Sequence, residues 1–487
     1  MNIDWQYIQT VLLILYEVAI VITVLFVVFS LILEKRDPQK TITWIIFILL
    51  LPIVGIILYF IIGKNYRKEK IFSKKILTDF EQIERIKNAH LAVTKLMSGK
   101  TREVEKSFGI INLLHNNNKA LLSEHNKVLV LNNGSETFNA ILHDINNAKD
   151  HIHLEYYIIE EDEIGNKIHD LLIKKAKQGI EVRLIYDDIG SWNLSSAFIE
   201  SLKEAGVEVF SFLPVKFYRL ATKINYRNHR KIIIVDGRVG FVGGLNIADR
   251  YIHGSHEVGL WRDTHLRLEG DAVISLQYVF LMDWNFVSNN FVHDEKYFPE
   301  TQVTDKCLVQ IAASGPDSDW ASIMQTYFYA ISTAKKYVYI STPYFMPNES
   351  LLTALKTIAL SGVDVRIILP SKSDSFISYW GSMSYVSDML DAGVKIFIYE
   401  KGFTHSKVLI VDDLICSVGT ANMDLRSFDQ NFEVNALIYN KEIACTLKAT
   451  FTDDLSSCLL ILQEDYDKRP FAHKVKESFT RIFSPLW

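Results

Sequence analysis

Two segments of the chain carry the same polar residues at the same spacing: NHRKIIIVDGRVGFVGGLN (residues 228–246) and THSKVLIVDDLICSVGTAN (residues 404–422). Each has a histidine, a lysine two residues later, an aspartate seven residues after the histidine and an asparagine seventeen residues after it. These residues are His229, Lys231, Asp236 and Asn246 in the first segment, and His405, Lys407, Asp412 and Asn422 in the second. One such match is a weak signal, but two matches with the asparagine at the same offset indicate a pair of related half-sites.

A phosphodiester is the chemical group that this set of side chains fits. The lysines and asparagines can neutralise and hydrogen-bond the non-bridging oxygens as charge develops on them. One histidine can attack phosphorus, while the other protonates the leaving alkoxide and then deprotonates the incoming alcohol or water. Lys231 and Lys407 supply the positive charge that Mg²⁺ supplies in many phosphoryl-transfer enzymes, so we expect neither a metal nor another cofactor.

The local sequence predicts how these side chains are positioned. KIIIVD and KVLIVD have the composition of buried strands, and residues two apart in a strand point to the same face. His229 and Lys231 are therefore expected on one face, as are the histidine and lysine of the second motif. Asp236 lies an odd number of residues from His229 and precedes a glycine, which indicates a turn into a second strand. We expect this aspartate to support the hairpin and not to carry a proton.

The motifs belong to an internal repeat that predicts an α/β fold. HIHLEYYII (residues 151–159) matches YVYISTPYF (residues 337–345), and KKAKQGIEVRLIYDD (residues 174–188) matches KTIALSGVDVRIILP (residues 356–370). Short β-branched runs alternate with helical segments that end at glycine, the pattern of βαβ units on a largely parallel sheet. We expect two α/β domains, residues 126–300 and 301–487, with the active site between them.

Two apolar runs near the N-terminus predict a membrane hairpin within residues 1–63. Residues 11–33 and 42–62 are each long enough, at about 1.5 Å per residue, to cross the hydrocarbon core as a helix. Six Lys and Arg residues follow the second run between residues 64 and 75, against three in the loop between the runs. This excess favours two spans in the cell membrane with the large domain on the cytoplasmic side, after a basic juxtamembrane connector at residues 64–125.

Composition excludes several other classes of protein. The 487 residues contain 52 Lys and Arg against 57 Asp and Glu, a net charge of −5, which disfavours binding of nucleic acid through bulk positive charge. The four cysteines have no CxxC spacing, so neither a zinc knuckle nor a disulfide framework is indicated.

The C-terminal stretch KRPFAHKVKESFTRIFSPLW mixes bases with aromatic residues. Such a stretch is typical either of an interfacial amphipathic helix or of a helix packed on its domain.

The duplicated His-Lys-Asp motif resembles that of the phospholipase D superfamily, and the resemblance covers residues 126–487. The N-terminal segment, with EKRDPQKTITW followed by LPIVG, resembles that of bacterial cardiolipin synthases. The resemblance implies a phosphatidyltransferase that condenses two phosphatidylglycerol molecules into cardiolipin and glycerol through a phosphatidyl-histidine intermediate. The expected partners are then phosphatidylglycerol and anionic membrane lipid, and not nucleic acid.

The resemblance also implies roles for individual residues. The active-site residues would be His229, Lys231, Asp236, His405, Lys407 and Asp412, with Asn246 and Asn422 in the phosphate site. The first histidine is the usual nucleophile of the family, which makes His229 the expected nucleophile and His405 the acid and base.

Members of the superfamily orient each histidine with a downstream acid. Glu433, 28 residues after His405, fits the second half, and either Asp263 or Glu257 fits the first. Gly244 departs from the family pattern, in which serine is common at this position. The equivalent residue of the second motif, Thr420, keeps a hydroxyl group. We expect this change to weaken one phosphate contact without altering the mechanism.

Three further interpretations compete with this one. A hydrolase of phospholipids or nucleic acid would use the same two histidines, although the net charge and the membrane segment disfavour nucleic acid. Another phosphatidyltransferase would share the motif. A catalytically inactive scaffold would have no need of His and Lys in both halves.

Other polar and aromatic residues call for separate interpretation. His151, His153 and Glu155 alternate along one predicted strand, but they lack a matched metal-ligand spacing, so pocket lining or strand packing is the better interpretation. Tyr157 and Tyr344 follow matching strands and either border the cleft or belong to the core.

Overall fold

The structure is a computed structural model, and it describes residues 5–33, 38–59, 102–214, 225–292 and 294–483. The chain forms two compact units. The first comprises Met1–Lys68, Val215–Asn225 and Ile482–Trp487, and the second comprises Glu69–Pro214 and Tyr226–Arg481. Most of the predicted basic connector, including all of its bases from residue 64 to residue 75, lies outside the described residues.

The N-terminal unit includes the helices α1 (Trp5–Leu33), α2 (Pro38–Leu50) and α3 (Pro52–Leu58). Within the described residues, only α1 is long and apolar enough to cross a membrane, over Ile8–Leu33 with a mean hydropathy of 2.9. The second predicted span, residues 42–62, is divided at Leu51, which has φ −134° and precedes Pro52. The 13 residues of α2 extend about 20 Å, less than the hydrocarbon thickness of roughly 30 Å. The two-span hairpin therefore stays a prediction.

Helices α2 and α3 fold back on each other at this break. The ring centroids of Trp44 and Tyr59 are 5.7 Å apart, although 15 residues of continuous helix would separate them by about 22 Å. Gly55 permits the close approach, because a Cβ at this position would lie 2.8 Å from the Cα of Ile48. Trp44, Ile48 and Tyr59 are buried together with residues of α1.

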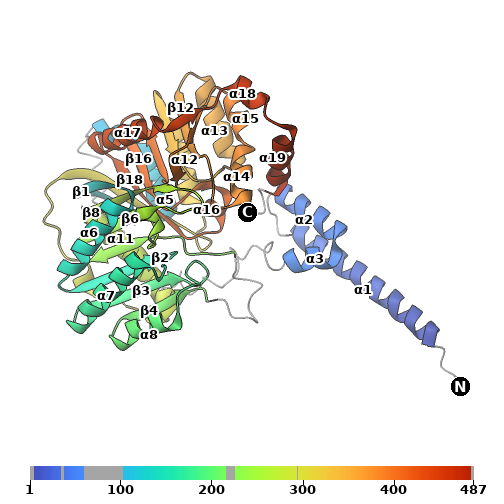
Figure 1. The fold of residues 1–487 in the computed structure, drawn as a ribbon, viewed down its shortest axis with the longest axis horizontal. Helices are drawn as coiled ribbons and strands as arrows, with labels where there is room; N and C mark the ends of the chain where they lie inside the picture. Colours follow the sequence, from blue (N-terminus) through green and yellow to red (C-terminus); the bar gives the residue numbers. More distant parts are fainter. Residues whose placement is uncertain (1–4, 34–37, 60–101, 215–224, 293, 484–487) are drawn as a thin grey trace. The chain divides into compact units, whose positions relative to one another are not determined.

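The second unit is built on a 15-stranded sheet that contains both halves of the repeat, in the order β19-β13-β12-β10-β15-β16-β18-β9-β1-β8-β6-β5-β2-β3-β4 (Figure 1). The first half contributes β1 (Leu122–Asn132), β2 (His151–Tyr156), β3 (Glu181–Asp187), β4 (Glu208–Phe212), β5 (Ile232–Val235), β6 (Val239–Gly243) and β8 (Thr264–Gly270). The second half contributes β9 (Lys306–Ser314), β10 (Tyr337–Ser341), β12 (Asp364–Pro370), β13 (Lys395–Tyr399), β15 (Val408–Val411), β16 (Ile415–Gly419), β18 (Glu433–Tyr439) and β19 (Cys458–Leu460). The halves join where β1 pairs antiparallel with β9.

The predicted βαβ units and hairpins are confirmed, and they occupy equivalent places in the two halves. The prediction of a largely parallel sheet is wrong, because the hairpins and the strands that join the halves pair antiparallel and only the βαβ strands are parallel. Strands β2, β3 and β4 are parallel, as are β10, β12 and β13. The antiparallel hairpins β5–β6 and β15–β16 lie beside them. Two short parallel pairs stand apart from the large sheet, β7 (Leu260–Arg262) with β14 (Gly402–Thr404) and β11 (Phe345–Met346) with β17 (Met423–Asp424).

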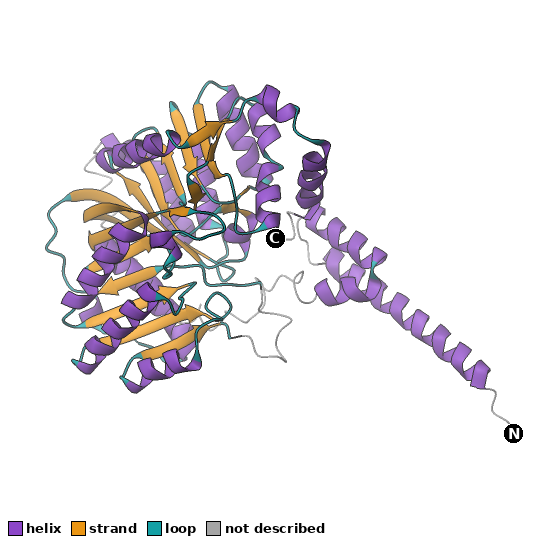
Figure 2. Ribbon diagram, viewed as in Figure 1, coloured by secondary structure: helices purple, strands orange, loops and turns teal. Residues whose placement is uncertain are grey.

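Helices cover both faces of this sheet (Figure 2). The helices described after α3 are α5 (Arg102–Asn118), α6 (Asn133–Asn147), α7 (Glu163–Lys177), α8 (Ser196–Glu204), α10 (Arg250–His253), α11 (Asp271–Ser288), α12 (Ser322–Ser332), α13 (Glu349–Leu360), α14 (Phe376–Met383), α15 (Val386–Asp391), α16 (Leu425–Asp429), α17 (Lys441–Leu455), α18 (Gln463–Asp467) and α19 (Phe471–Phe483), with a short 3₁₀ turn at Glu295–Tyr297. Helix α5 lies within the predicted connector, yet Ile110 and Leu114 are buried in the core of the second half.

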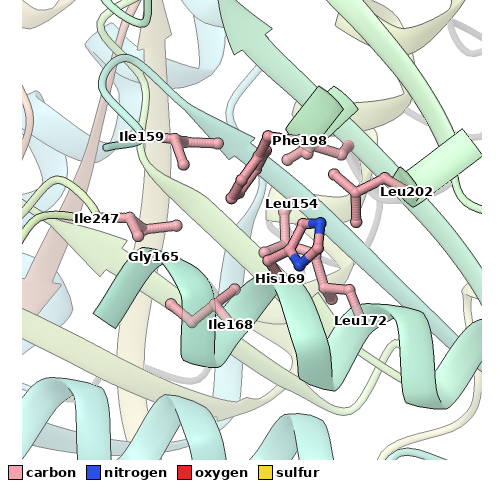
Figure 3. A pocket seen from close by; sticks show the side chains of 10 residues that line it. Leu154, Ile159, Gly165, Ile168, His169, Leu172, Phe198, Leu202 and Ile247 are labelled. Atoms are coloured by element: carbon pink, nitrogen blue, oxygen red, sulfur yellow. The ribbon is translucent and has the colours of Figure 1, made fainter. Parts of the chain in front are cut away.

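Each half has its own apolar core, and the core of the first half contains a small void. The void lies between α7, α8 and strands β2 and β3, with Leu154, Ile168 and Phe198 on its wall (Figure 3). None of the residues predicted to do chemistry lines it. It is therefore a packing feature of the domain and not a substrate site.

Candidate active site

The two motif aspartates lie at the turns of their hairpins, as the spacing predicts. Asp236 has φ 54°, and its carboxylate accepts hydrogen bonds from the backbone N–H groups of Lys149, Asp150 and His151. Asp412 has φ 55° and makes the equivalent bonds at the start of β10. Each aspartate lies seven residues after its histidine, beyond a strand of four residues, and an extended run of this length reaches about 23 Å. The aspartates fasten the hairpin to the neighbouring strand and do not contact the histidines.

The motif lysines are buried next to their histidines. Lys231 Nζ donates to the backbone oxygen of His229 at 2.7 Å, and Lys407 Nζ donates to that of His405 at 2.5 Å. Burial lowers the pKa of Lys407 to about 8, although the charges of Asp263 and Glu433 act in the opposite direction. Burial also lowers the pKa of Lys231 well below its ordinary value. A phosphate anion bound beside these two lysines would raise their pKa values and so favour the charged ammonium form.

Each histidine is oriented by an acid from the other half of the repeat. His229 Nδ1 lies 3.0 Å from Oε2 of Glu433, and His405 Nδ1 lies 2.7 Å from Oδ2 of Asp263. The sequence-based assignment of Glu433 to the histidine of its own half is therefore wrong. Glu433 orients His229, and Asp263 orients His405. Glu257 contacts neither histidine and is exposed in the turn before β7.

Backbone pairing between the halves explains this exchange. The N–H of His229 donates to the carbonyl of Phe432 at 2.9 Å, and the next residue along the chain is Glu433. The N–H of His405 donates to the carbonyl of Arg262 at 2.7 Å, and the next residue is Asp263. The active residues thus meet between the two halves, where each histidine segment pairs with the segment that carries the opposite acid.

Burial sets the protonation of the two histidines. It lowers the pKa of His229 to about 4, even though Glu433 acts to raise it. It also lowers the pKa of His405 well below its ordinary value, and the charges of Lys407 and Lys231 add to the effect. Both imidazoles are therefore neutral near pH 7 in the empty site. Since each Nδ1 carries the proton donated to a carboxylate, each Nε2 presents a lone pair.

The two acids differ in their ease of ionisation. Burial raises the pKa of Asp263 to about 6, with partial compensation by Lys407 and by the backbone N–H of Thr264. Burial also acts to raise the pKa of Glu433, but the neighbouring His229 and Lys231 and the hydroxyl of Thr420 outweigh it and lower that pKa. Glu433 is the more firmly ionised of the two carboxylates.

Gly244 and Thr420 occupy equivalent positions with different consequences. The Thr420 hydroxyl donates to Oε2 of Glu433 at 2.5 Å. A Cβ at Gly244 would lie 2.2 Å from Oδ1 of Asp263. The glycine therefore leaves room for the Asp263 carboxylate, so the departure from the family pattern concerns the orienting acid and not a phosphate contact.

The two motif asparagines are buried in different environments. Asn246 accepts from the N–H of Ile158 at 3.2 Å and donates to the hydroxyl of Tyr251 at 2.6 Å. The side-chain oxygen of Asn422 has no hydrogen-bond partner among the described residues. The second asparagine thus has an acceptor free for a ligand or a water.

Aromatic rings enclose the histidines. Tyr157 lies edge-on to His229 with ring centroids 5.0 Å apart, so it borders the site as one of its two interpretations predicted. Trp261 and Tyr251 lie 5.3 and 5.6 Å from the His405 ring, and the sequence analysis missed both. Trp261 lies two residues before Asp263, and Tyr251 lies five residues after Asn246, so their closeness in sequence to predicted site residues could have indicated them.

The alternating residues of β2 take part in packing and in ion pairs. The His153 ring stacks on Phe280 at 4.6 Å, and His151 lies edge-on to Tyr297 at 4.9 Å. Glu155 accepts from the side-chain amide of Asn228. In the described parts of the chain, no group of three or more His, Cys, Asp or Glu residues is arranged to hold a metal ion.

Comparison with known proteins identifies relatives of the whole chain. A family model described as "Cardiolipin synthase, PLD-like domain" matches residues 141–284 and 327–455, and one described as "Phospholipase_D-nuclease N-terminal" matches residues 19–64. A cardiolipin synthase of Geobacillus sp. (strain WCH70) is 44% identical over 467 residues, covering 95% of this chain and 92% of that protein. The major cardiolipin synthase of Bacillus subtilis (strain 168) is 42% identical over 487 residues, covering 98% of this chain and 99% of that protein.

A solved structure shares the fold. The crystal structure of the phosphatidylserine synthase of Haemophilus influenzae Rd KW20 superimposes with a TM-score of 0.58 at 15% identity. The match covers 77% of this chain and 98% of that chain. At this identity the likeness establishes the architecture alone.

Proposed function

The chain belongs to the cardiolipin synthase family of phospholipase D-like phosphatidyltransferases, and from this premise we propose that it converts two phosphatidylglycerol molecules into cardiolipin and glycerol. The observation that carries the proposal is the pair of exchanged contacts, His229 with Glu433 and His405 with Asp263. They bring two oriented imidazoles and two buried ammonium groups to one place, which suits transfer at a phosphodiester.

In the first step, Nε2 of His229 attacks the phosphorus of one phosphatidylglycerol. The bond from phosphorus to the headgroup glycerol oxygen breaks, and that oxygen takes a proton from Nε2 of His405, which leaves glycerol and a phosphatidyl-histidine. The negative charge of the bound phosphodiester favours the protonated form of His405, which is neutral in the empty site. Lys231 and Lys407 stabilise the charge on the non-bridging oxygens.

In the second step, a primary hydroxyl of the second phosphatidylglycerol attacks the same phosphorus. Nε2 of His405, now neutral, accepts the hydroxyl proton, and the bond from phosphorus to His229 breaks. Cardiolipin is released, and His229 returns to its starting form. The asparagine Asn422, with its free acceptor, and Asn246 complete the proposed phosphate site.

The assignment of His229 as nucleophile rests on the difference between the acids. A nucleophile is best paired with a firmly ionised carboxylate that stabilises the positive charge on its ring, and Glu433 has the lowered pKa. Asp263, with its pKa raised to about 6, suits the histidine that gains and loses a proton during the cycle.

The overall reaction is tested by incubating the purified, detergent-solubilised chain with labelled phosphatidylglycerol and resolving the products. Cardiolipin with glycerol is expected, and neither product should form with His229→Ala. If phosphatidic acid is formed and cardiolipin is not, the enzyme is a hydrolase and the proposal is wrong. Glu257→Gln serves as a matched control, because this exposed acid lies outside the site.

The nucleophile is tested with a phosphatidyl substrate whose leaving group is nitrophenol, which departs without an acid. His405→Ala should then release nitrophenol in a burst and accumulate a labelled phosphatidyl-enzyme, while His229→Ala should show neither. The opposite pattern would make His405 the nucleophile.

Membrane attachment and domain division complete the proposal. In this proposal α1 is the membrane anchor and the catalytic unit lies on the cytoplasmic side. We keep the proposed division between residues 300 and 301, but β1 already begins at Leu122 and α5 packs in the core of the second half. Cys445 is exposed, whereas Cys307 and Cys416 are buried, so Cys445 is a natural reporter of sidedness. An impermeant maleimide should label it only after cells are permeabilised. Labelling in intact cells would place the catalytic unit outside.

A further inference from the structure

Helix α19 (Phe471–Phe483) turns its polar side toward the protein and its apolar side outward. Glu477 and Thr480 are each only 5% exposed. The Arg469 guanidinium donates to both oxygens of Glu477, and Arg481 donates to the backbone oxygen of Ser384. A surface helix of a soluble protein ordinarily does the reverse and buries its apolar stripe. Polar contacts therefore hold α19 in place, and its apolar side is largely exposed.

The outward side forms a continuous stripe. Phe471 is 80% exposed, Val475 50%, Phe479 62% and Ile482 61%, and their spacing places them on one helix face. Lys474 and Lys476 lie roughly 100° to either side of this stripe at 100° per residue. Apolar residues with flanking lysines are the pattern of a helix that lies in a lipid interface, where lysine stems extend toward the headgroups.

Helix α14 packs beside α19, on the side of the stripe where Lys476 lies (Figure 1). The Trp380 ring lies edge-on to His473 with centroids 4.9 Å apart, and Lys476 Nζ lies 4.8 Å from the centre of the same ring. Phe376, at the start of α14, is 63% exposed. The two helices thus present a surface of exposed apolar residues on both sides of Lys476.

This surface is joined to the active site through a short segment. Asp374, two residues before Phe376, accepts from the hydroxyl of Tyr344 at 2.7 Å, and its charge acts on Lys407. The equivalent loop of the first half carries Trp192, which is 80% exposed. The preceding residue, Ser191, donates to the backbone oxygen of Tyr157, whose ring lies against His229. Exposed aromatic residues therefore lie next to the site in both halves.

We propose that Phe376, Phe471 and Val475, with Trp192 on the other half, dock the catalytic unit onto an anionic phospholipid layer so that headgroups reach the two histidines. The proposal rests on the proposed function in taking lipid as the substrate. Lipid is favoured over a protein partner because lysines flank the stripe, the stripe borders the residues that act on a headgroup, and α1 already holds the chain at a membrane.

Docking is tested with the full chain reconstituted into vesicles of phosphatidylglycerol and phosphatidylcholine. Cys445 and Cys458 are replaced by serine, and an environment-sensitive fluorophore is attached at Phe471→Cys. Leu360→Cys is the matched control, since Leu360 is 73% exposed and precedes β12 at the end opposite α14. Quenching by lipids with spin labels in their acyl chains should be several-fold greater at position 471 than at position 360. Equal quenching would overturn docking.

Activity gives the second measurement. Phe471→Ser combined with Val475→Ser should raise the KM for vesicles about tenfold or more, the effect of losing roughly 1.4 kcal/mol of interfacial binding. The kcat on short-chain phosphatidylglycerol, supplied as monomers, should not change. Leu360→Ser should change neither constant. An unchanged vesicle KM in the double variant would overturn the proposal.

The outcomes separate docking from the reaction itself. Strong quenching at position 471 without any cardiolipin would retain docking and contradict the proposed function. Cardiolipin formation without quenching at position 471 would support the proposed function and overturn docking. A label at position 471 that is already shielded in detergent, before lipid is added, would assign the surface to another part of the chain or to a second copy, and would overturn lipid docking.

Discussion

Nδ1 of His229 lies 3.0 Å from a carboxylate oxygen of Glu433, a residue 204 positions away in the other half of the repeat. The equivalent contact, His405 with Asp263, crosses the halves in the opposite direction at 2.7 Å. Neither half can orient its own histidine. This arrangement makes the site dependent on both halves, even though each half carries a complete motif.

Replacement of Glu433 by glutamine should reduce kcat at least about a hundredfold, because an amide cannot stabilise the imidazolium that forms when His229 attacks. Steady-state formation of cardiolipin measures the loss, and the circular dichroism spectrum shows whether the fold is kept. Glu257→Gln, at the exposed acid that the sequence also offered, should leave kcat unchanged. A large loss at Glu257 with none at Glu433 would contradict the observed pairing.

The position of Gly244 predicts an unusual result for a change toward the family pattern. Gly244→Ser should lower activity, because the new Cβ would lie 2.2 Å from Oδ1 of Asp263 and displace that carboxylate from His405. Thr420→Ser is the matched control in the second half, since it keeps the hydroxyl that donates to Glu433. The kcat of both variants is measured, and it should fall for Gly244→Ser but not for Thr420→Ser. A Gly244→Ser enzyme as active as the parent would show that Asp263 does not need this space.

The pH profile of kcat/KM should have two limbs. Asp263 must be ionised to accept Nδ1–H of His405, and its pKa is raised to about 6, so activity should fall as pH drops through that value. Lys407 must be protonated, and its pKa is lowered to about 8, so activity should also fall as pH rises through that value. Lys231 has the same role and a lowered pKa, so Lys231→Arg combined with Lys407→Arg should move the alkaline limb to higher pH, because a guanidinium does not lose its proton in this range. A profile with neither limb would exclude both roles.

The motif aspartates should affect stability and not chemistry. Asp236→Asn weakens three backbone hydrogen bonds to one carboxylate, which should lower the free energy of unfolding by about 1–3 kcal/mol. The kcat of the folded fraction should be close to that of the parent. The thermal unfolding midpoint and kcat are measured on the same preparation. A loss of kcat without a shift in midpoint would return Asp236 to the catalytic set that the family resemblance implies.

The sequence predicted the parts of the site that depend on local spacing. His229 and Lys231, two apart before β5, and the turn at Asp236 follow from the two-residue period of a strand. The partner of each histidine does not follow from spacing, because it depends on the pairing of His229 with Phe432 and of His405 with Arg262 across the halves. Trp261 was missed for the same reason, since it meets His405 only through the pairing of β7 with β14.

The N-terminal unit shows the limit of hydropathy. Residues 42–62 are apolar throughout, so composition alone predicts one spanning helix, yet Pro52 cannot donate the backbone hydrogen bond that a continuous helix requires. Its place at the start of α3 was a visible signal for a break. The fold-back that follows also needs Gly55, whose role lies in packing and not in hydropathy.

This fold-back leads to a prediction about the membrane segment. A Trp44→Cys, Tyr59→Cys pair should be joined within one chain by a short bifunctional thiol cross-linker in membranes, because the rings at these positions are in contact with centroids 5.7 Å apart. A continuous helix over residues 42–62 would hold the two positions about 22 Å apart and prevent the cross-link. Protection of both thiols from a maleimide-linked polymer measures the product, with Trp44→Cys alone as control. Adding Gly55→Leu should abolish the cross-link, since the larger side chain has no space against Ile48. Free thiols in the parent pair would favour a single spanning helix and thus the two-span hairpin.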